Sequence, residues 1–211
     1  MTNEAPWTKS YQKIAIPAAK CILVNALAMY RKSKDDTGTY IGKAYWLNDR
    51  FVITDGITAI FLDKELPELP VYTGDVSKAF NPFPYLDKAK EHNRVQYETE
   101  MMSQKLLTKH IQLVKDQNPE LFKERNDVLI GFKYNDKIQI GFNAKYLLNL
   151  VKILGPNTKM YGDDYGFFDF KPVYFCSDIG EAVLCPCRLQ ISDNMKRAGT
   201  PYPLHKEGES V

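Results

Sequence analysis

The chain has 211 residues, which is enough for one ordinary domain with insertions or for two small ones. Its apolar content of 44% and charged content of 26% permit a packed core and argue against global disorder. The formal net charge is only +2, so a surface that binds nucleic acid would have to come from the local placement of basic residues.

Three features of the sequence indicate where in the cell the protein is located: its N-terminus, its longest apolar stretch and its cysteines. Glu4 stands near the N-terminus with no apolar run behind it, which argues against a signal peptide. The apolar stretch at residues 21–30 is interrupted by Asn25 and is too short to cross a bilayer. The cysteines lack the spacing of a secreted disulfide framework; they are Cys21, Cys176, Cys185 and Cys187. We therefore expect a cytoplasmic protein with no membrane partner.

The first half of the chain is predicted to place a helix between strands. Pro17 fits the first turn of a helix, and Asn48-Asp49 is a favourable turn pair. The predicted elements are, in order, a tail at 1–12, a strand at 13–16, a helix from Pro17 to about Lys34, and strands at 39–47 and 51–62.

Residues 64–126 differ in character and are interpreted as an insertion. They open with a Pro-rich linker and end with a polar helix predicted at about 96–117. Between these lies a run, Phe80 to Tyr85, in which prolines and aromatic residues alternate. This run is open to two interpretations, a packed crossing segment or a partner-binding motif.

The second half repeats the strand and helix pattern. Asn143 is a plausible N-cap for a helix, and Gly155-Pro156 is a plausible stop. The predicted elements are strands at 127–134 and 137–142, a helix at 143–154, strands at 158–161, 167–171, 173–177 and 181–189, and a tail at 192–211.

The two halves share a local pattern in which Lys-Ile-x-Ile precedes a helix containing Ala-Lys. Chance similarity of short amphipathic segments is the alternative explanation. A repeated strand–helix–strands unit predicts an α+β fold with both helices on one face of the strands. We expect a single domain at 13–190, with halves at about 13–62 and 127–190.

Basic residues gather on the outer face of each predicted helix. The first helix has Lys20, Arg31 and Lys34 on this face. The second helix has Lys145 and Lys152, with Asn149 between them. Such a face is either an ordinary solvated surface or a surface that contacts DNA phosphates without reading the bases. Val24 and Leu27 lie in the same sector as the first set, which favours a protein contact over DNA.

Three segments resemble one known family. The segment Ile138 to Leu148, with Ile-Gly-Phe-Asn running into a helix, resembles part of the β subunit of bacterial DNA polymerase III, the sliding clamp. Ala182 to Leu189, which closes with Pro-x-Arg-Leu, resembles the end of that family's chain. Thr54-Asp55-Gly56 is similar to the end of a clamp strand. The resemblance covers about residues 13–62 and 127–189.

The resemblance implies a DNA clamp domain: a non-enzymatic processivity factor in DNA replication that binds duplex DNA without sequence preference through its helices. It also implies a cleft for short hydrophobic peptides of polymerases and other replication proteins. The matching positions here are Thr54, Asp55, Gly56, Val183, Leu184, Pro186 and Cys187. An ordinary core strand is the alternative interpretation for residues 183–187.

Several features depart from the family's pattern. The family follows Thr-Asp-Gly with His-Arg, whereas this chain has Ile57-Thr58, and the chain continues for about twenty residues beyond Leu189. A closed ring would need further copies of this chain, as a homo-oligomer, or another partner. The alternative function is a clamp-fold interaction module that forms no ring and does not bind DNA.

Catalysis and metal binding find little support in the sequence. His92 and His110 lie in the insertion and His205 in the tail, where solvated histidines are common. Asp163-Asp164 is flanked by glycines, so we interpret this pair as a turn and not as a metal site. On a strand, Cys185 and Cys187 point to one face, which favours core packing over a ligand pair, and no CxxC motif supports zinc. We expect no enzyme, no metal and no cofactor.

Overall fold

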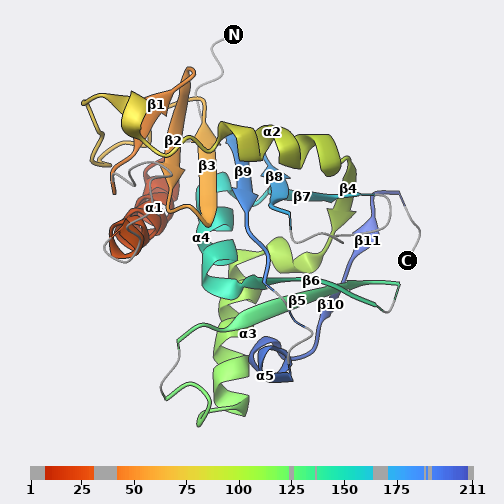
Figure 1. The fold of residues 1–211 in the computed structure, drawn as a ribbon. Coiled ribbons are helices and arrows are strands. Elements are labelled where there is room, and N and C mark those ends of the chain that lie inside the picture. The colour runs from red at the N-terminus through yellow and green to blue at the C-terminus, as the bar shows by residue number, and fades with distance from the viewer. Residues whose placement is uncertain are drawn as a thin grey trace.

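The computed structural model describes residues 8–30, 42–123, 126–135, 137–163, 171–187, 189 and 192–208 (Figure 1). The fold is mixed α+β, as predicted, with a large antiparallel sheet. The elements are α1 (Lys9–Tyr30), β1 (Tyr45–Leu47), β2 (Arg50–Thr54), β3 (Thr58–Leu62), η1 (Val76–Lys78), α2 (Phe83–His92), β4 (Val95–Glu98), η2 (Glu100–Met102), α3 (Gln104–Gln117), β5 (Leu129–Tyr134), β6 (Lys137–Asn143), α4 (Ala144–Leu154), β7 (Lys159–Gly162), β8 (Val173–Cys176), β9 (Gly180–Leu184), α5 (Ser192–Ala198), β10 (Tyr202–Pro203) and β11 (His205–Lys206).

The large sheet joins the early and late parts of the chain. Its strand order is β1-β2-β3-β9-β8-β7-β4-β11, and every neighbouring pair is antiparallel. Each of α1 and α4 is followed by three consecutive strands of this sheet, β1–β3 and β7–β9 respectively. The two three-stranded units meet where β3 pairs with β9, with Ile60 opposite Ala182. A second sheet, in the order β10-β5-β6, is smaller.

Helices cover both faces of the central strands. On one face, Phe51, Ile60 and Phe175 belong to the same core as side chains of α1 and α4, and these two helices pack against each other. On the other face, α2 packs against the sheet through Leu86 and Ala89. Because both faces are covered, every residue of β3 is buried. Figure 1 shows α4 in the middle of the molecule, with α1 and α3 on its two sides.

Three local predictions are confirmed by the structure. Asn48 and Asp49 both have positive φ, of 48° and 60°, and form the two-residue turn between β1 and β2. The side chain of Asn143 accepts a hydrogen bond from the Lys145 amide at 3.0 Å, so it caps α4. Gly155, with φ of 87°, ends that helix.

Other boundaries require correction. The strand predicted at 13–16 is part of α1, because Ala15 and Ile16 are buried when this stretch is helical. Pro17 lies inside that helix and not in its first turn. The strand predicted at 51–62 is a hairpin, since the chain turns at residues 55–57 between β2 and β3. The helix predicted at 96–117 begins only at Gln104, after β4 and η2.

The tail predicted at 192–211 is folded over residues 192–208, and the tail predicted at 1–12 gives way to α1 at Lys9. Tyr202 pairs with Phe132 of β5 and the Leu204 amide donates to the Lys133 carbonyl oxygen at 2.7 Å, so the C-terminal segment runs alongside β5. The His110 ring nitrogens lie 2.9 Å from the Tyr202 hydroxyl and 2.8 Å from the Leu129 carbonyl oxygen. Burial lowers the pKa of His110, so it links the insertion to this segment as a neutral ring.

Some predictions fall outside the described residues. Arg31 and Lys34 of the predicted basic face, the strand predicted at 167–171 and Asp164 are among them.

A charged network fastens α2 to the sheet. The Glu181 carboxylate on β9 accepts hydrogen bonds from Arg50 at 3.0 Å and from the Tyr174 hydroxyl at 2.6 Å, and it pairs with Lys90 of α2. Burial alone would raise the pKa of Glu181, but the bonds from Lys90 and Tyr174 outweigh this effect and lower it. The Glu181 side chain is 18% exposed, so the network is partly shielded from solvent.

We predict that Glu181→Gln lowers the free energy of unfolding by about 1 kcal/mol, because Lys90 loses its charged partner and Arg50 keeps only its pair with the exposed Asp63. Chemical denaturation at pH 7 measures this loss. Since the folded pKa is depressed, the contribution is complete above the pKa of unfolded glutamate, about 4.3, and disappears as the pH falls through the folded value. The difference in the free energy of unfolding between wild type and variant should therefore become smaller at acidic pH.

The matched control is Glu120→Gln, which breaks the exposed pair of Glu120 with Lys123. That change should cost less than about 0.5 kcal/mol. Equal losses in the two variants would contradict a role for Glu181 in holding α2.

Candidate functional site

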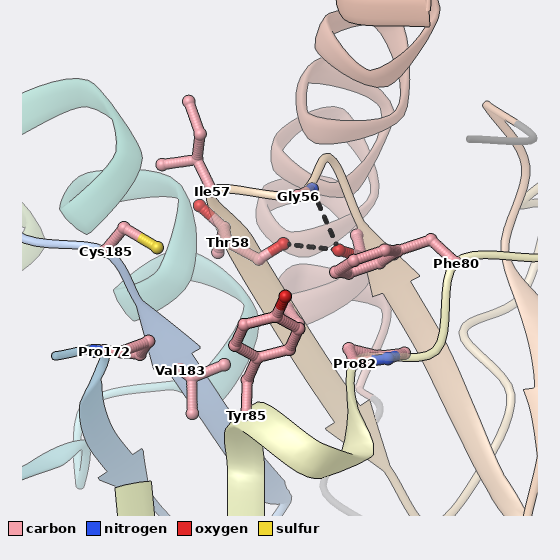
Figure 2. Close-up of a pocket in the computed structure, with 11 residues that line it drawn as sticks. Gly56, Ile57, Thr58, Phe80, Pro82, Tyr85, Pro172, Val183 and Cys185 are labelled. Atoms are coloured by element: carbon pink, nitrogen blue, oxygen red, sulfur yellow. Dashed lines mark hydrogen bonds between the residues drawn. The ribbon is translucent and has the colours of Figure 1, made fainter. Parts of the chain in front are cut away.

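A cleft lies where the β2–β3 turn, the end of β9 and the insertion meet (Figure 2). Its volume is about 150 Å³, and it contains no charged lining residue. The lining residues are Thr54, Gly56, Ile57, Thr58 and Ala59 from the turn and its strands, Val183 and Cys185 from β9 and the residues after it, Phe80, Pro82 and Tyr85 from the insertion, and Pro172. The arrangement suits an uncharged apolar group with few polar anchors.

The β2–β3 turn forms one wall and is fixed by its own side chains. The Thr54 hydroxyl donates to the Thr58 carbonyl oxygen at 2.8 Å and accepts from the Gly56 amide at 3.1 Å. The fully buried Asp55 accepts from the Ile57 amide at 3.0 Å and from the Thr58 amide at 2.7 Å. Gly56 has φ of 82°, a conformation that favours glycine. The turn is therefore rigid before any ligand arrives.

Asp55 also connects this turn to α1. The Asn25 side chain of this helix faces the carboxylate closely enough to act on its pKa. Burial raises the pKa of Asp55, and the hydrogen bonds from the Thr58 and Ile57 amides, together with the nearby Asn25 side chain, oppose that rise.

The second wall follows β9. The Cys185 amide donates to the Ile57 carbonyl oxygen at 2.9 Å, which holds the residues after β9 beside the turn. Burial, and then the charge of Asp55, raise the pKa of the Cys185 thiol. This thiol is therefore a poor nucleophile and contributes an apolar surface to the cleft.

The residues predicted for a peptide cleft separate into two groups. Thr54, Gly56 and Val183 line the cleft, whereas Asp55 lies behind the turn and holds it. Leu184 is fully buried in the core. Cys187 donates its amide to the Gly141 carbonyl oxygen at 2.7 Å and packs beside Leu129, and neither Cys187 nor Pro186 lines the cleft.

The insertion wall was missed from the sequence. Pro82 is buried, and the Tyr85 ring stacks on Phe80 with 5.8 Å between centroids. The signal was present in the run of prolines and aromatic residues, but nothing local indicates that this run lies against Val183, a hundred residues later.

The helix lysines lie at different depths. Lys20 and Lys145 are exposed, Lys152 is half-buried, and Asn149 is buried with 6% of its surface exposed. Because α1 begins at Lys9, it also presents Lys9 and Lys13. At 100° per residue, Lys9, Lys13 and Lys20 fall within about 40° of one another. Neither α1 nor α4 contains an acidic residue.

Within the ranges that the structure describes, no group of three or more His, Cys, Asp or Glu side chains is placed to bind a metal ion. No helix among these residues has the length and apolarity needed to cross a membrane.

Comparisons with known proteins give one structural likeness. No family model matches the chain, and no curated protein matches it. The chain is similar to the crystal structure of the beta sliding clamp of C. crescentus, with 16% sequence identity and a TM-score of 0.43. The match covers 79% of this chain and 63% of the clamp chain, so this chain spans less than two thirds of that protein's length.

We predict that Asp55→Ala lowers the free energy of unfolding by about 2 kcal/mol, because the buried Thr58 amide and the partly buried Ile57 amide lose their acceptor. Asp55→Asn should retain wild-type stability or exceed it, since the amide oxygen still accepts both bonds and no buried charge remains. Thermal and urea unfolding at pH 7 measure both variants.

Asp75→Ala is the control, because Asp75 accepts a similar bond from the Ser77 amide at 2.9 Å on the exposed surface. Its loss should be smaller than that of Asp55→Ala. A loss in Asp55→Asn as large as that in Asp55→Ala would show that the charge itself, and not the acceptor geometry, holds the turn.

Proposed function

We propose that this protein is a non-enzymatic, clamp-related accessory protein of DNA replication that contacts duplex DNA without reading its sequence. The observation that carries the proposal is the pair of packed helices α1 and α4, which carry lysines and no acidic residue. Lysines on helix faces bind phosphates as point charges and leave the bases unread.

The order of elements supports a duplicated clamp-like domain. In each half, as we assign them, one helix is followed by three antiparallel strands, and the halves meet at the β3–β9 pair. Residues 64–126 are then an insertion that adds β4 to the edge of the second half, beside β7. The resemblance of residues 138–148 and 182–189 to the sliding-clamp family agrees with this assignment.

The cleft supports a second part of the proposal, the binding of a short apolar segment of a replication protein. The turn after Thr54 and the strand at Val183, which resemble the family's peptide-binding segments, lie side by side in this chain. The resemblance implied that these segments come from neighbouring domains. Here one chain supplies both, so the cleft needs no second copy.

We predict that replacing Lys9, Lys13, Lys20 and Lys145 by glutamate weakens binding to a 30-base-pair duplex at least tenfold at about 100 mM salt. The dependence of affinity on salt should also become shallower, because fewer counterions are released. Fluorescence anisotropy at several salt concentrations measures both quantities.

The control variant changes Lys43, Lys64, Lys88 and Lys159 to glutamate. These exposed lysines lie outside α1 and α4, and the variant has the same net charge as the first. If both variants bind duplex DNA equally weakly, the loss of affinity follows from net charge alone, and the proposal of an interface on α1 and α4 is wrong.

One observation favours an alternative, a clamp-fold interaction module that forms no ring and does not bind DNA. The inserted α3 packs against α4, and Asn149 of α4 is buried. The insertion thus covers part of the helix that would face DNA.

Sedimentation with and without duplex DNA separates the two functions. We expect DNA to co-sediment with the protein, and assembly beyond the monomer where copies close around it. A monomer at micromolar concentration that retains no DNA would establish the interaction module instead.

A further inference from the structure

Tyr85 occupies the centre of the cleft. Figure 2 shows its ring rising from α2 into the middle of the lining residues, with the hydroxyl directed toward the strand of Thr58. The ring is stacked on Phe80, and 48% of the residue surface remains exposed. An aromatic ring that is half exposed at the mouth of a cleft is well placed to contact a ligand.

The helix that carries Tyr85 is fixed independently of this side chain. Leu86 and Ala89 are buried against the sheet, Phe83 packs on Phe61 with 5.0 Å between ring centroids, and Lys90 pairs with Glu181. A change at Tyr85 therefore alters the shape of the cleft without releasing α2.

The space beside Tyr85 limits what can enter. A cavity of about 150 Å³ with apolar walls holds one group the size of a benzene ring. While the Tyr85 ring is present, a second side chain of similar size would lie outside this space, where it would bury less apolar surface. Removing that ring would join its volume to the cavity.

We propose that Tyr85 is the specificity-determining residue of the cleft and restricts a bound segment to one apolar anchor side chain. This inference rests on the proposed binding of apolar segments. It assigns to the insertion a role in selecting the partner, because an insertion residue sets the size of the site.

The test uses the full chain and two probes, acetyl-Gly-Phe-Gly-amide with one apolar anchor and acetyl-Leu-Phe-Gly-amide with two adjacent anchors. Titrations followed by nuclear magnetic resonance monitor the amide signals of Ile57 and Val183. In the wild type the two affinities should agree within about threefold. In Tyr85→Ala the two-anchor peptide should bind about tenfold more tightly than the one-anchor peptide, because a further leucine is buried.

Three further variants test this interpretation. Tyr85→Phe keeps the ring and should keep the wild-type ratio, and Leu113→Ala, which truncates a half-exposed residue on α3, should do the same. Tyr85→Leu, which retains part of the wall, should give an intermediate ratio and serves if Tyr85→Ala unfolds.

The outcomes separate the inference from the function beneath it. Binding of both peptides with the same ratio in Tyr85→Ala and wild type would overturn the role of Tyr85 and leave the cleft as a binding site. If neither peptide shifts the Ile57 and Val183 signals in any variant, the cleft binds no apolar segment and both proposals fail.

Discussion

The buried carboxylate of Asp55 ties together parts of the protein that are distant in sequence. It accepts hydrogen bonds from the amides of Ile57 and Thr58 in the β2–β3 turn, and it faces the Asn25 side chain of α1. The Ile57 carbonyl oxygen in turn accepts a hydrogen bond from the amide of Cys185, which follows β9. Burial of a carboxylate is unfavourable, and the raised pKa of Asp55 reflects that cost. The bonds to Ile57 and Thr58 offset part of that cost and fix the shape of the turn that lines the cleft.

The two sides of the cleft are stabilised by different physics. The turn and β9 depend on buried hydrogen bonds, which break only when the core opens. The insertion wall depends on aromatic packing and on the partly exposed network around Glu181, where salt and acid weaken the attraction. The cleft therefore has a rigid floor and a wall whose attachment varies with conditions. In the binding role that we propose, changes in the insertion wall would alter which apolar segments fit while the hydrogen-bonded turn keeps its shape.

Much of the fold could be predicted where the signal is local. Asn143 and Gly155 bound α4 because capping and positive φ depend on single residues. The stretch around Ile16 alternates like a strand, yet it is helical because α4 offers a surface that buries Ala15 and Ile16 together. The cleft could be predicted only in part. Thr54 and Val183 came from a family resemblance, whereas Tyr85 joins them through packing between α2 and β9, and no local pattern encodes that contact.

The insertion also makes the two helices unequal. On α1, Lys9, Lys13 and Lys20 are exposed in one narrow sector, and no acidic residue interrupts them. On α4, the corresponding face is partly covered, since Lys152 is half-buried. A phosphate contact needs the ammonium group to remain accessible, and desolvation without a partner is costly for a charge. In the function that we propose, α1 therefore makes most of the DNA contact, and α4 contributes chiefly through Lys145 at its first turn. The half to which the insertion adds β4 therefore presents less of its charged helix face to solvent than the half that contains α1.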